Sequence, residues 1–415
     1  MLEKRIFLCL VSQTYGMNEI LKDAENIFDE LKQIRRFLHR NAEVGFDLKK
    51  TTEFIEEKLK EYGYEPKRVG KSGVVACVGK REKGEKAVLL RADMDGLPIQ
   101  EKSGVSYACK SGNMHACGHD LHATALIGSA KILKEKEQEL KGEVKLLFQP
   151  AEEILSGAKA VIADGVLENP QVGCAFSLHV ATGIDLPCGT VVVPKSGVGA
   201  PAADFFKIQV KGKGCHGSTP QNGVDSALVC SQILIALQTV IAREIPPSET
   251  CALTIGRIES GTTANALASD GVLEGTLRAF DEKVREKMKK RLKEIASGVA
   301  KSFQAKASVE FLSGCPALLN DKSLTKFIYK RAQELLGKEN VFSAEEFGQG
   351  NKELGGSEDF AYIAKEVPSV MLAVGAGARK DGYQYPLHHE KVRFDERALP
   401  VCSALYSYIA LKYFE

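Results

Sequence analysis

The stretch Met114-His115-Ala116-Cys117-Gly118-His119-Asp120-Leu121-His122 packs three histidines, one cysteine and one aspartate into nine positions. Apolar residues recur at helical spacing directly after it, which predicts a helix that begins near Asp120 with this residue as its N-cap. In a loop, side chains two residues apart can converge on one point, as they cannot on a helix. A cysteine thiolate and an imidazole that converge at the start of a helix would form half of a metal site. The alternative is a helix start that carries Cys117 and His119 by chance.

Composition and charge argue against some classes of function. The chain has 415 residues, of which 44% are hydrophobic and 27% charged, and this predicts a soluble protein of two domains. A net charge of +2 and the lack of a Lys/Arg cluster argue against a nucleic-acid partner. The 11 cysteines are scattered and lack a CxxC pair, so we expect a reducing, cytoplasmic location. No apolar run approaches membrane-spanning length, so no membrane partner is expected. From Asn18, a candidate N-cap, apolar residues recur at helical spacing in one stripe that runs to Leu38, which makes Met17 a candidate start.

Several predicted strands end in polar groups. Apolar runs at 87–92, 144–148 and 175–178 are followed by Asp93 and Asp95, by Glu152 and Glu153, and by His179. Open α/β folds place their sites at the carboxyl edge of the sheet. The alternation of strand, polar loop and helix therefore predicts an α/β fold with its site along one edge.

The pattern changes near residue 200. A β-α-β-β-α-β order runs for about 110 residues and suits a small domain with helices on one face of an antiparallel sheet. Buried strand and helix patterns then return. We therefore predict a discontinuous catalytic domain, 17–199 and 313–415, with a lid domain inserted at 200–312.

The helix start at 117–119, the polar strand ends and the polar segment after Pro386-Leu387 together supply a candidate ligand set. Adjacent residues at a strand end point to opposite sides, so one of Glu152 and Glu153 could bind metal while the other moves protons. Asp93, Asp95 or Asp120 could orient the imidazoles, and Cys117 could bridge two ions. Five ligands shared between two metals leave positions open for water and substrate. The candidate ligands are Cys117, His119, Glu153, His179 and His388.

Two other classes compete with this interpretation. A cysteine hydrolase would use Cys117 as its nucleophile, but it would leave the carboxylates and the other histidines without a role. A binding protein on a retired enzyme scaffold would not need intact ligands. Thiolate and imidazole ligands favour Zn, Mn, Co or Ni over Mg or Ca.

From about residue 20 to its end, the chain resembles the metal-dependent N-acyl-amino-acid amidohydrolases, the group of hippurate hydrolases, bacterial aminoacylases and auxin-conjugate hydrolases. The matching segments are LRADMDGLP (90–98), HACGHD (115–120), FQPAEE (148–153), GCHGSTP (214–220), GSEDF (356–360) and PLH (386–388). The resemblance implies a two-domain metallopeptidase fold with a ferredoxin-like lid that mediates dimerisation. It also implies hydrolysis of the amide between an acyl group and an amino acid. A dipeptidase or an N-acetyl-diaminopimelate deacetylase would carry much the same motifs.

Residue roles follow from the resemblance. It implies the same five metal ligands, two divalent ions per subunit (Mn or Zn, with Ni or Co as further options), and Glu152 as general base. His216 matches the lid histidine that stabilises the oxyanion, typically in the site of the neighbouring subunit of a homodimer or tetramer. Asn265 and Arg278 match lid positions that hold polar groups of the substrate.

The chain also departs from the family pattern. Ala42 replaces the usual Pro in the early motif at 39–46, Glu390 and Val392 replace Pro and Phe in the last motif, and His389 replaces Asn or Ser. These changes flank ligands without replacing any, so they bear on loop shape and acyl preference.

Overall fold

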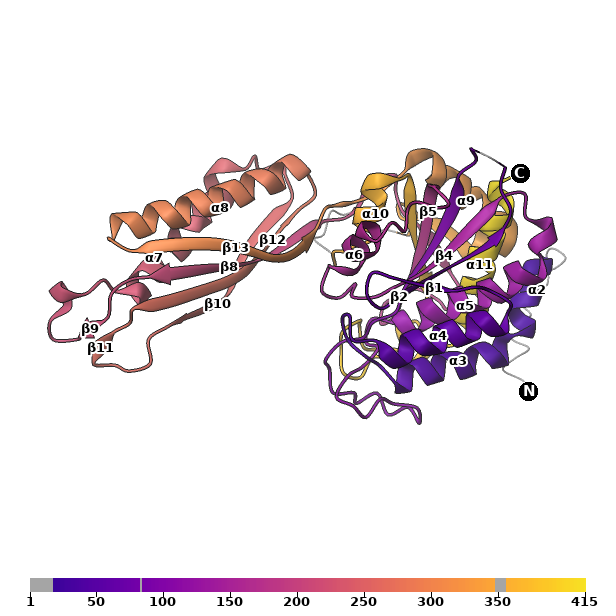
Figure 1. Ribbon diagram of the computed structural model, residues 1–415, viewed down its shortest axis with the longest axis horizontal. Helices are drawn as coiled ribbons and strands as arrows, with labels where there is room; N and C mark the ends of the chain where they lie inside the picture. The colour runs from indigo at the N-terminus through magenta and orange to yellow at the C-terminus, as the bar shows by residue number, and fades with distance from the viewer. Residues whose placement is uncertain (1–17, 83, 348–355) are drawn as a thin grey trace. The chain divides into compact units, whose positions relative to one another are not determined.

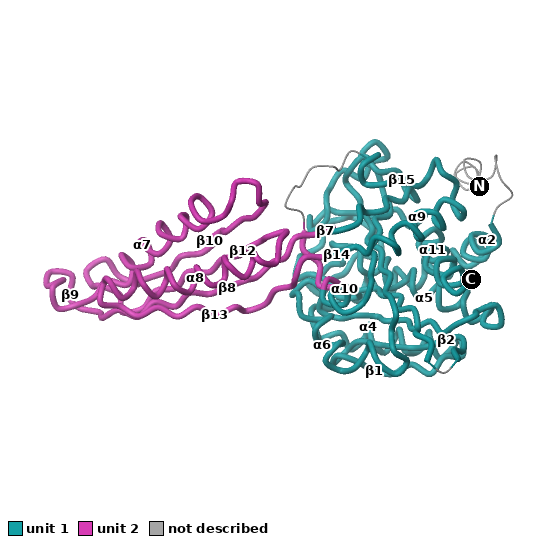
Figure 2. The backbone as a smooth tube through the Cα atoms, turned by 90° about the horizontal axis from the view of Figure 1, so that it is seen from above, with its two compact units in different colours: residues 1–197, 319–351, 362–415 teal, residues 198–318, 352–361 magenta. Residues whose placement is uncertain are grey.

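The computed structural model describes residues 18–82, 84–347 and 356–415. The candidate start at Met17 lies outside these residues. The chain divides into two units, unit 1 with residues 1–197, 319–351 and 362–415, and unit 2 with residues 198–318 and 352–361 (Figure 2).

Unit 1 is built on an eight-stranded mixed sheet (Figure 1). In sheet order its strands are β1 (Lys67–Val69), β2 (Gly73–Gly79), β4 (Glu143–Gln149), β3 (Ala87–Asp93), β5 (Val172–Ala181), β16 (Ser369–Gly375), β6 (Val191–Val193) and β15 (Val341–Ser343). The central strands β4, β3, β5 and β16 run parallel. Every residue of β3 is buried, as expected for a central parallel strand covered on both faces. The predicted α/β fold is confirmed, and the carboxyl ends of the parallel strands meet at one edge.

Two buried helices form the centre of the helical layer of unit 1. Helices α5 (His119–Glu135) and α11 (Ala398–Tyr413) pack on each other and on β3. Both are apolar on nearly all sides because neighbouring elements cover them. The other helices are α2 (Glu19–Asn26), α3 (Phe28–Arg40), α4 (Lys49–Glu61), α6 (Gly157–Ala163) and α9 (Lys322–Leu336), with short 3₁₀ turns η1 (Glu137–Glu139), η4 (Lys338–Asn340) and η5 (Arg379–Asp381).

The first helical pattern differs from its prediction in one respect. Asn18 caps it as predicted, with its side-chain oxygen accepting a hydrogen bond from the Ile20 amide at 3.0 Å. However, the apolar stripe is divided at Ile27 into α2 and α3. The stripe continues across the break because α2 and α3 both pack on α5 and α11.

Unit 2 has a four-stranded antiparallel sheet in the order β10 (Cys251–Ser260), β12 (Asp270–Ala279), β8 (Ala202–Lys211) and β13 (Lys306–Cys315). Helices α7 (Ser226–Thr239) and α8 (Glu282–Ser302) pack on one face through Phe206, Ile208 and Val210 of β8. The predicted β-α-β-β-α-β order of elements is present. Smaller elements are β9 (Cys215–His216), η2 (Pro220–Asn222), η3 (Val240–Glu244) and β11 (Ala266–Leu267). Strands β7 (Gly197–Ala200) and β14 (Leu318–Asn320) and helix α10 (Ala361–Glu366) include the unit boundaries.

One helix contradicts the expectation that no apolar run approaches membrane-spanning length. The stretch Ser226–Glu244, which comprises α7 and η3, is long and apolar enough to cross a membrane by length and composition. Its residues Val229, Ile233 and Leu237 are fully buried against the rest of unit 2. A core helix passes the same test, so this is weak evidence for a membrane span.

Candidate active site

The turn that carries Cys117 depends on a glycine. Gly118 adopts a left-handed backbone (φ 87°), and a Cβ atom there would lie 2.5 Å from Cγ2 of Val180. This turn places Cys117 just before the helix and His119 at its first position. Only glycine satisfies both the backbone angle and the close approach.

The predicted N-cap is wrong. Helix α5 begins at His119 with Gly118 in the N-cap position, and no side chain caps it. Asp120 is instead the second helical residue, and its carboxylate pairs with Arg35 and His39 of α3. Two cationic partners from another helix hold this carboxylate away from the capping position.

The five predicted ligands converge. Cys117 Sγ lies 3.4 Å from Nε2 of His179 and 3.3 Å from Nε2 of His388. Glu153 Oε1 lies 3.8 Å from Nε2 of His119 and 3.6 Å from Nε2 of His388. They come from the turn before α5, the start of α5, the turn after β4, the interior of β5 and the segment before α11. The sequence predicted that His179 follows the end of its strand. In the structure, His179 lies within β5.

Glu152 lies beside this cluster. The carboxylates of Glu152 and Glu153 and a ring nitrogen of His119 all lie within 4.8 Å of one another. The prediction that the two glutamates point to opposite sides is therefore wrong. Ala151 has a left-handed backbone (φ 56°) and the chain turns here, so strand alternation does not apply.

Asp95 holds both the glutamate turn and a ligand imidazole. Its carboxylate accepts the amide N–H of Glu152 at 3.1 Å and of Glu153 at 3.2 Å. Its Oδ1 also lies 3.3 Å from Nδ1 of His119. Asp95 thus occupies the orienting position that was predicted for one of three aspartates, since a carboxylate on Nδ1 leaves Nε2 free to bind metal.

Asp93 and Asp120 orient other histidines. Asp93 lies 2.5 Å from Nδ1 of His122, and Nε2 of His122 accepts the amide N–H of Val180 at 2.9 Å. His122 therefore fixes β5 next to His179. No role was predicted for His122, although its position one helical turn after His119 places both on one face. Asp120 contacts His39, which is not among the predicted ligands.

The donor set fits divalent cations. Among the described residues, Nε2 of His119 and Oε1 of Glu153 are buried without a hydrogen-bond partner. Burial raises the pKa of Glu153 to about 7 and also raises the pKa of the Cys117 thiol. Burial disfavours charge on His119, but Asp93, Cys117 and Asp95 together outweigh this effect and raise its pKa well above 6.5. These groups retain protons that a bound cation would displace, because a thiol, imidazoles and carboxylates are buried close together here.

The predicted lid residues lie in unit 2 at two separate places. His216 is exposed, and its backbone pairs with Ala266, next to Asn265. Nδ1 of His216 accepts a hydrogen bond from the backbone amide of Ser218 at 3.1 Å. In the neutral ring the proton is therefore on Nε2. Arg278 donates to Oγ of Ser357 at 3.0 Å and pairs with Ala203 at the start of β8. β12 separates the two places by roughly 25 Å at 3.3 Å per residue.

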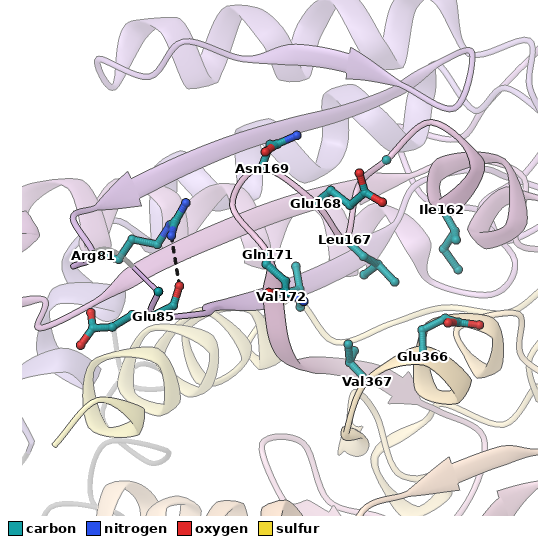
Figure 3. A pocket seen from close by; sticks show the side chains of 12 residues that line it. Arg81, Glu85, Ile162, Leu167, Glu168, Asn169, Gln171, Val172, Glu366 and Val367 are labelled. Carbon is teal, nitrogen blue, oxygen red and sulfur yellow. Dashed lines mark hydrogen bonds between the residues drawn. The ribbon is translucent and has the colours of Figure 1, made fainter.

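A hollow of about 600 Å³ lies elsewhere in unit 1 (Figure 3). It is lined by Glu168 and Gln171, which precede β5, and by Arg81 and Glu85, which precede β3. These residues mark the amino ends of the parallel strands, whereas the ligand cluster follows their carboxyl ends. The hollow is therefore separate from the candidate site.

The sequence of this chain matches those of known proteins. The model of peptidase family M20/M25/M40 matches residues 89–412. This chain belongs to that family. It is 38% identical to N-acetyl-L-cysteine deacetylase of Bacillus subtilis over 89% of this chain and 85% of that protein. It is 32% identical to hippurate hydrolase of Campylobacter jejuni over 92% of this chain and 96% of that protein.

A solved structure supports the fold of this M20-family chain. The YXEP protein of Bacillus subtilis, described as a dinuclear metal binding peptidase of family M20, aligns with a TM-score of 0.75 and 31% identity. The alignment covers 94% of this chain and 99% of that one. The predictions of the family, of the two-domain metallopeptidase fold class and of a hydrolase acting on amides are thereby confirmed.

Proposed function

We propose that this chain hydrolyses the amide bond of N-acyl amino acids with two divalent ions, Mn or Zn, with Ni or Co as further options. Cys117, His119, Glu153, His179 and His388 would hold the ions. The observation that carries the proposal is the convergence of these five side chains beside the carboxylate of Glu152. Five ligands around two ions leave coordination positions for water and substrate.

The residues around the cluster have separate tasks. When bound, the two ions would lower the pKa of a water molecule toward neutrality and would polarise the amide carbonyl. Glu152 accepts the proton of this water and returns it to the leaving nitrogen. The Nε2–H of His216 would donate to the oxyanion, while Asn265 and Arg278 would bind polar groups of the substrate.

The names of the relatives support the substrate class. N-acetyl-L-cysteine and hippurate, which appear in those names, are both N-acyl amino acids. The test is to incubate the metal-loaded protein with N-acetyl and N-benzoyl derivatives of a set of amino acids. We expect release of free amino acid from at least one compound. A panel from which nothing is released would contradict the proposal.

We also propose that the protein is a homodimer formed through unit 2. Leu228 and Ile235 on α7 are 47% and 60% exposed, and Ile258 on β10 is 47% exposed. Within the described residues, β10 pairs with β12 alone and so forms an edge of the sheet. An apolar helix face beside an open edge strand fits a second copy of the same surface.

The ten described cysteines are free thiols, which supports a location in the reducing cytoplasm.

Two subunits would build each site. A substrate of N-acyl amino acid size cannot span the roughly 25 Å of β12 between Arg278 and the pair His216 and Asn265. One unit 2 therefore cannot supply all three residues to one substrate. We propose that His216 acts in the site of the neighbouring subunit.

Subunit exchange tests this arrangement. Glu152→Ala and His216→Ala proteins are each expected to be inactive. Random exchange makes about half the dimers mixed, and one site of each mixed dimer has both groups intact, so activity should recover to roughly a quarter of wild type. Native mass spectrometry verifies the exchange. If the subunits exchange and the mixture is no more active than its parents, His216 acts within its own subunit.

A further inference from the structure

His39, in the early motif at 39–46, is buried and has no part in the proposed chemistry. It lies near the end of α3, and both of its ring nitrogens face carboxylates. Nδ1 lies 2.8 Å from Oδ2 of Asp120, and Nε2 lies 3.0 Å from Oε1 of Glu101. An ionised carboxylate only accepts hydrogen bonds, so each ring nitrogen donates and the ring is an imidazolium.

The charges around His39 favour this form. Burial and the nearby charge of Arg35 disfavour the imidazolium, but Asp120 and Glu101 together outweigh these effects and raise the pKa of His39. Burial also opposes ionisation of Glu101, but its hydrogen bond from His39 lowers the pKa of that carboxyl. A buried cation between two anions is stable in this position because each charge has a partner.

Arg35, one turn earlier on α3, completes the group. Its Nε donates to Oδ2 of Asp120 at 2.8 Å, and its Nη1 donates to the Tyr107 hydroxyl at 2.6 Å and to Glu396 at 3.3 Å. Two cations of α3 thus hold the second residue of α5. His39 also contacts Glu101, which lies in the long connection from β3 to α5.

The start of α5 needs this support. Its N-cap, Gly118, supplies no side-chain hydrogen bond. Asp120 is adjacent to His119 and three residues after Cys117, so a shift of Asp120 would move both ligands. We propose that His39 is a positioning residue, and that its hydrogen bond to Asp120 fixes the turn that presents Cys117 and His119 to the metal ions, while Glu101 serves to anchor the ring. This inference rests on the proposed metal centre.

Two matched variants test whether the hydrogen bond from His39 to Asp120 positions the metal ligands. The amide nitrogen of asparagine takes roughly the place of Nδ1, and that of glutamine roughly the place of Nε2. His39→Asn keeps the donor to Asp120, and His39→Gln keeps only the donor to Glu101. Both lose the positive charge, so a role in stability alone would affect them alike.

The readouts are the dissociation constant for Co(II), its thiolate charge-transfer absorption, and kcat and KM of the metal-loaded dimer. For His39→Gln we expect at least about tenfold weaker binding, an altered absorption band and a lower kcat at nearly unchanged KM. His39→Asn should stay within about threefold of wild type. Equal effects of the two variants, or wild-type metal binding by His39→Gln, would overturn the proposal. If His39→Gln does not fold, Arg35→Lys takes its place. This variant keeps the charge but loses the forked contact to Asp120 and Tyr107, so weaker Co(II) binding supports the proposal and wild-type binding overturns it.

Lys145 provides a control. This buried lysine donates to the carbonyl oxygens of Val166, Glu168 and Pro170 at 2.7–3.0 Å, at the amino ends of the strands. Lys145→Met should lower the melting temperature and leave the Co(II) spectrum unchanged. Failure of the wild type to bind any metal would instead refute the proposed function, so the two failures are distinguishable.

Discussion

Glu152→Gln is expected to lower kcat by roughly 10²-fold or more while the metal content stays near that of wild type. Glutamine preserves the shape of the side chain but cannot accept a proton. The carboxylate of Glu152 lies within 4.8 Å of ligand atoms of His119 and Glu153, and its backbone amide is held by Asp95. The loss should therefore appear in turnover and not in assembly of the site.

Glu153→Gln is the matched control, because it makes the same chemical change one residue away. Glu153 Oε1 is buried near His119 and His388 without a hydrogen-bond partner in the described structure, as expected of an atom that binds metal. Its substitution should lower metal content, measured by elemental analysis of the dialysed protein. If Glu152→Gln loses as much metal as Glu153→Gln, the two roles are exchanged.

Removal of metal is expected to abolish activity. A chelator should leave an inactive protein, and Mn or Zn should restore it as nearly two equivalents bind per chain. Cys117 lies within hydrogen-bonding distance of both His179 and His388, which suits a thiolate shared by two ions.

Cys117→Ser supplies the comparison for the metal experiment. A hydroxyl is a harder and poorer ligand than a thiolate for these ions, so this variant should bind less metal under the same conditions. Full activity of a sample shown to be free of metal would refute the two-metal account. It would favour the alternative in which Cys117 is a nucleophile.

The sequence predicted the residue types of the site better than their orientation. Cys117, His119, Glu153, His179 and His388 were identifiable because each stands at a predicted helix start, strand end or polar segment, and because the chain has only 8 histidines. The relative orientation of Glu152 and Glu153 was not, because it depends on the left-handed backbone of Ala151. Local periodicity carries no signal for such an angle in a residue other than glycine.

The partners of Asp120 were missed for a related reason. Its spacing before an apolar run predicts an N-cap, but Arg35 and His39 lie more than 80 residues earlier in the chain. Tertiary contacts of this kind override a local preference. His216 lies in the two-stranded sheet of β9 and β11, and Arg278 lies in the four-stranded sheet of unit 2. Their separation depends on strand register and likewise required the structure.

The most direct test of the account compares two amides of the same amino acid on one metal-loaded sample. Initial rates give kcat/KM for its best N-acyl derivative and for a dipeptide with the same C-terminal residue, with Glu152→Gln measured in parallel. The account predicts that the N-acyl compound is cleaved at least about tenfold more efficiently and that Glu152→Gln cleaves neither appreciably. More efficient cleavage of the dipeptide, or cleavage of neither compound by a sample that holds two metal equivalents, would contradict it.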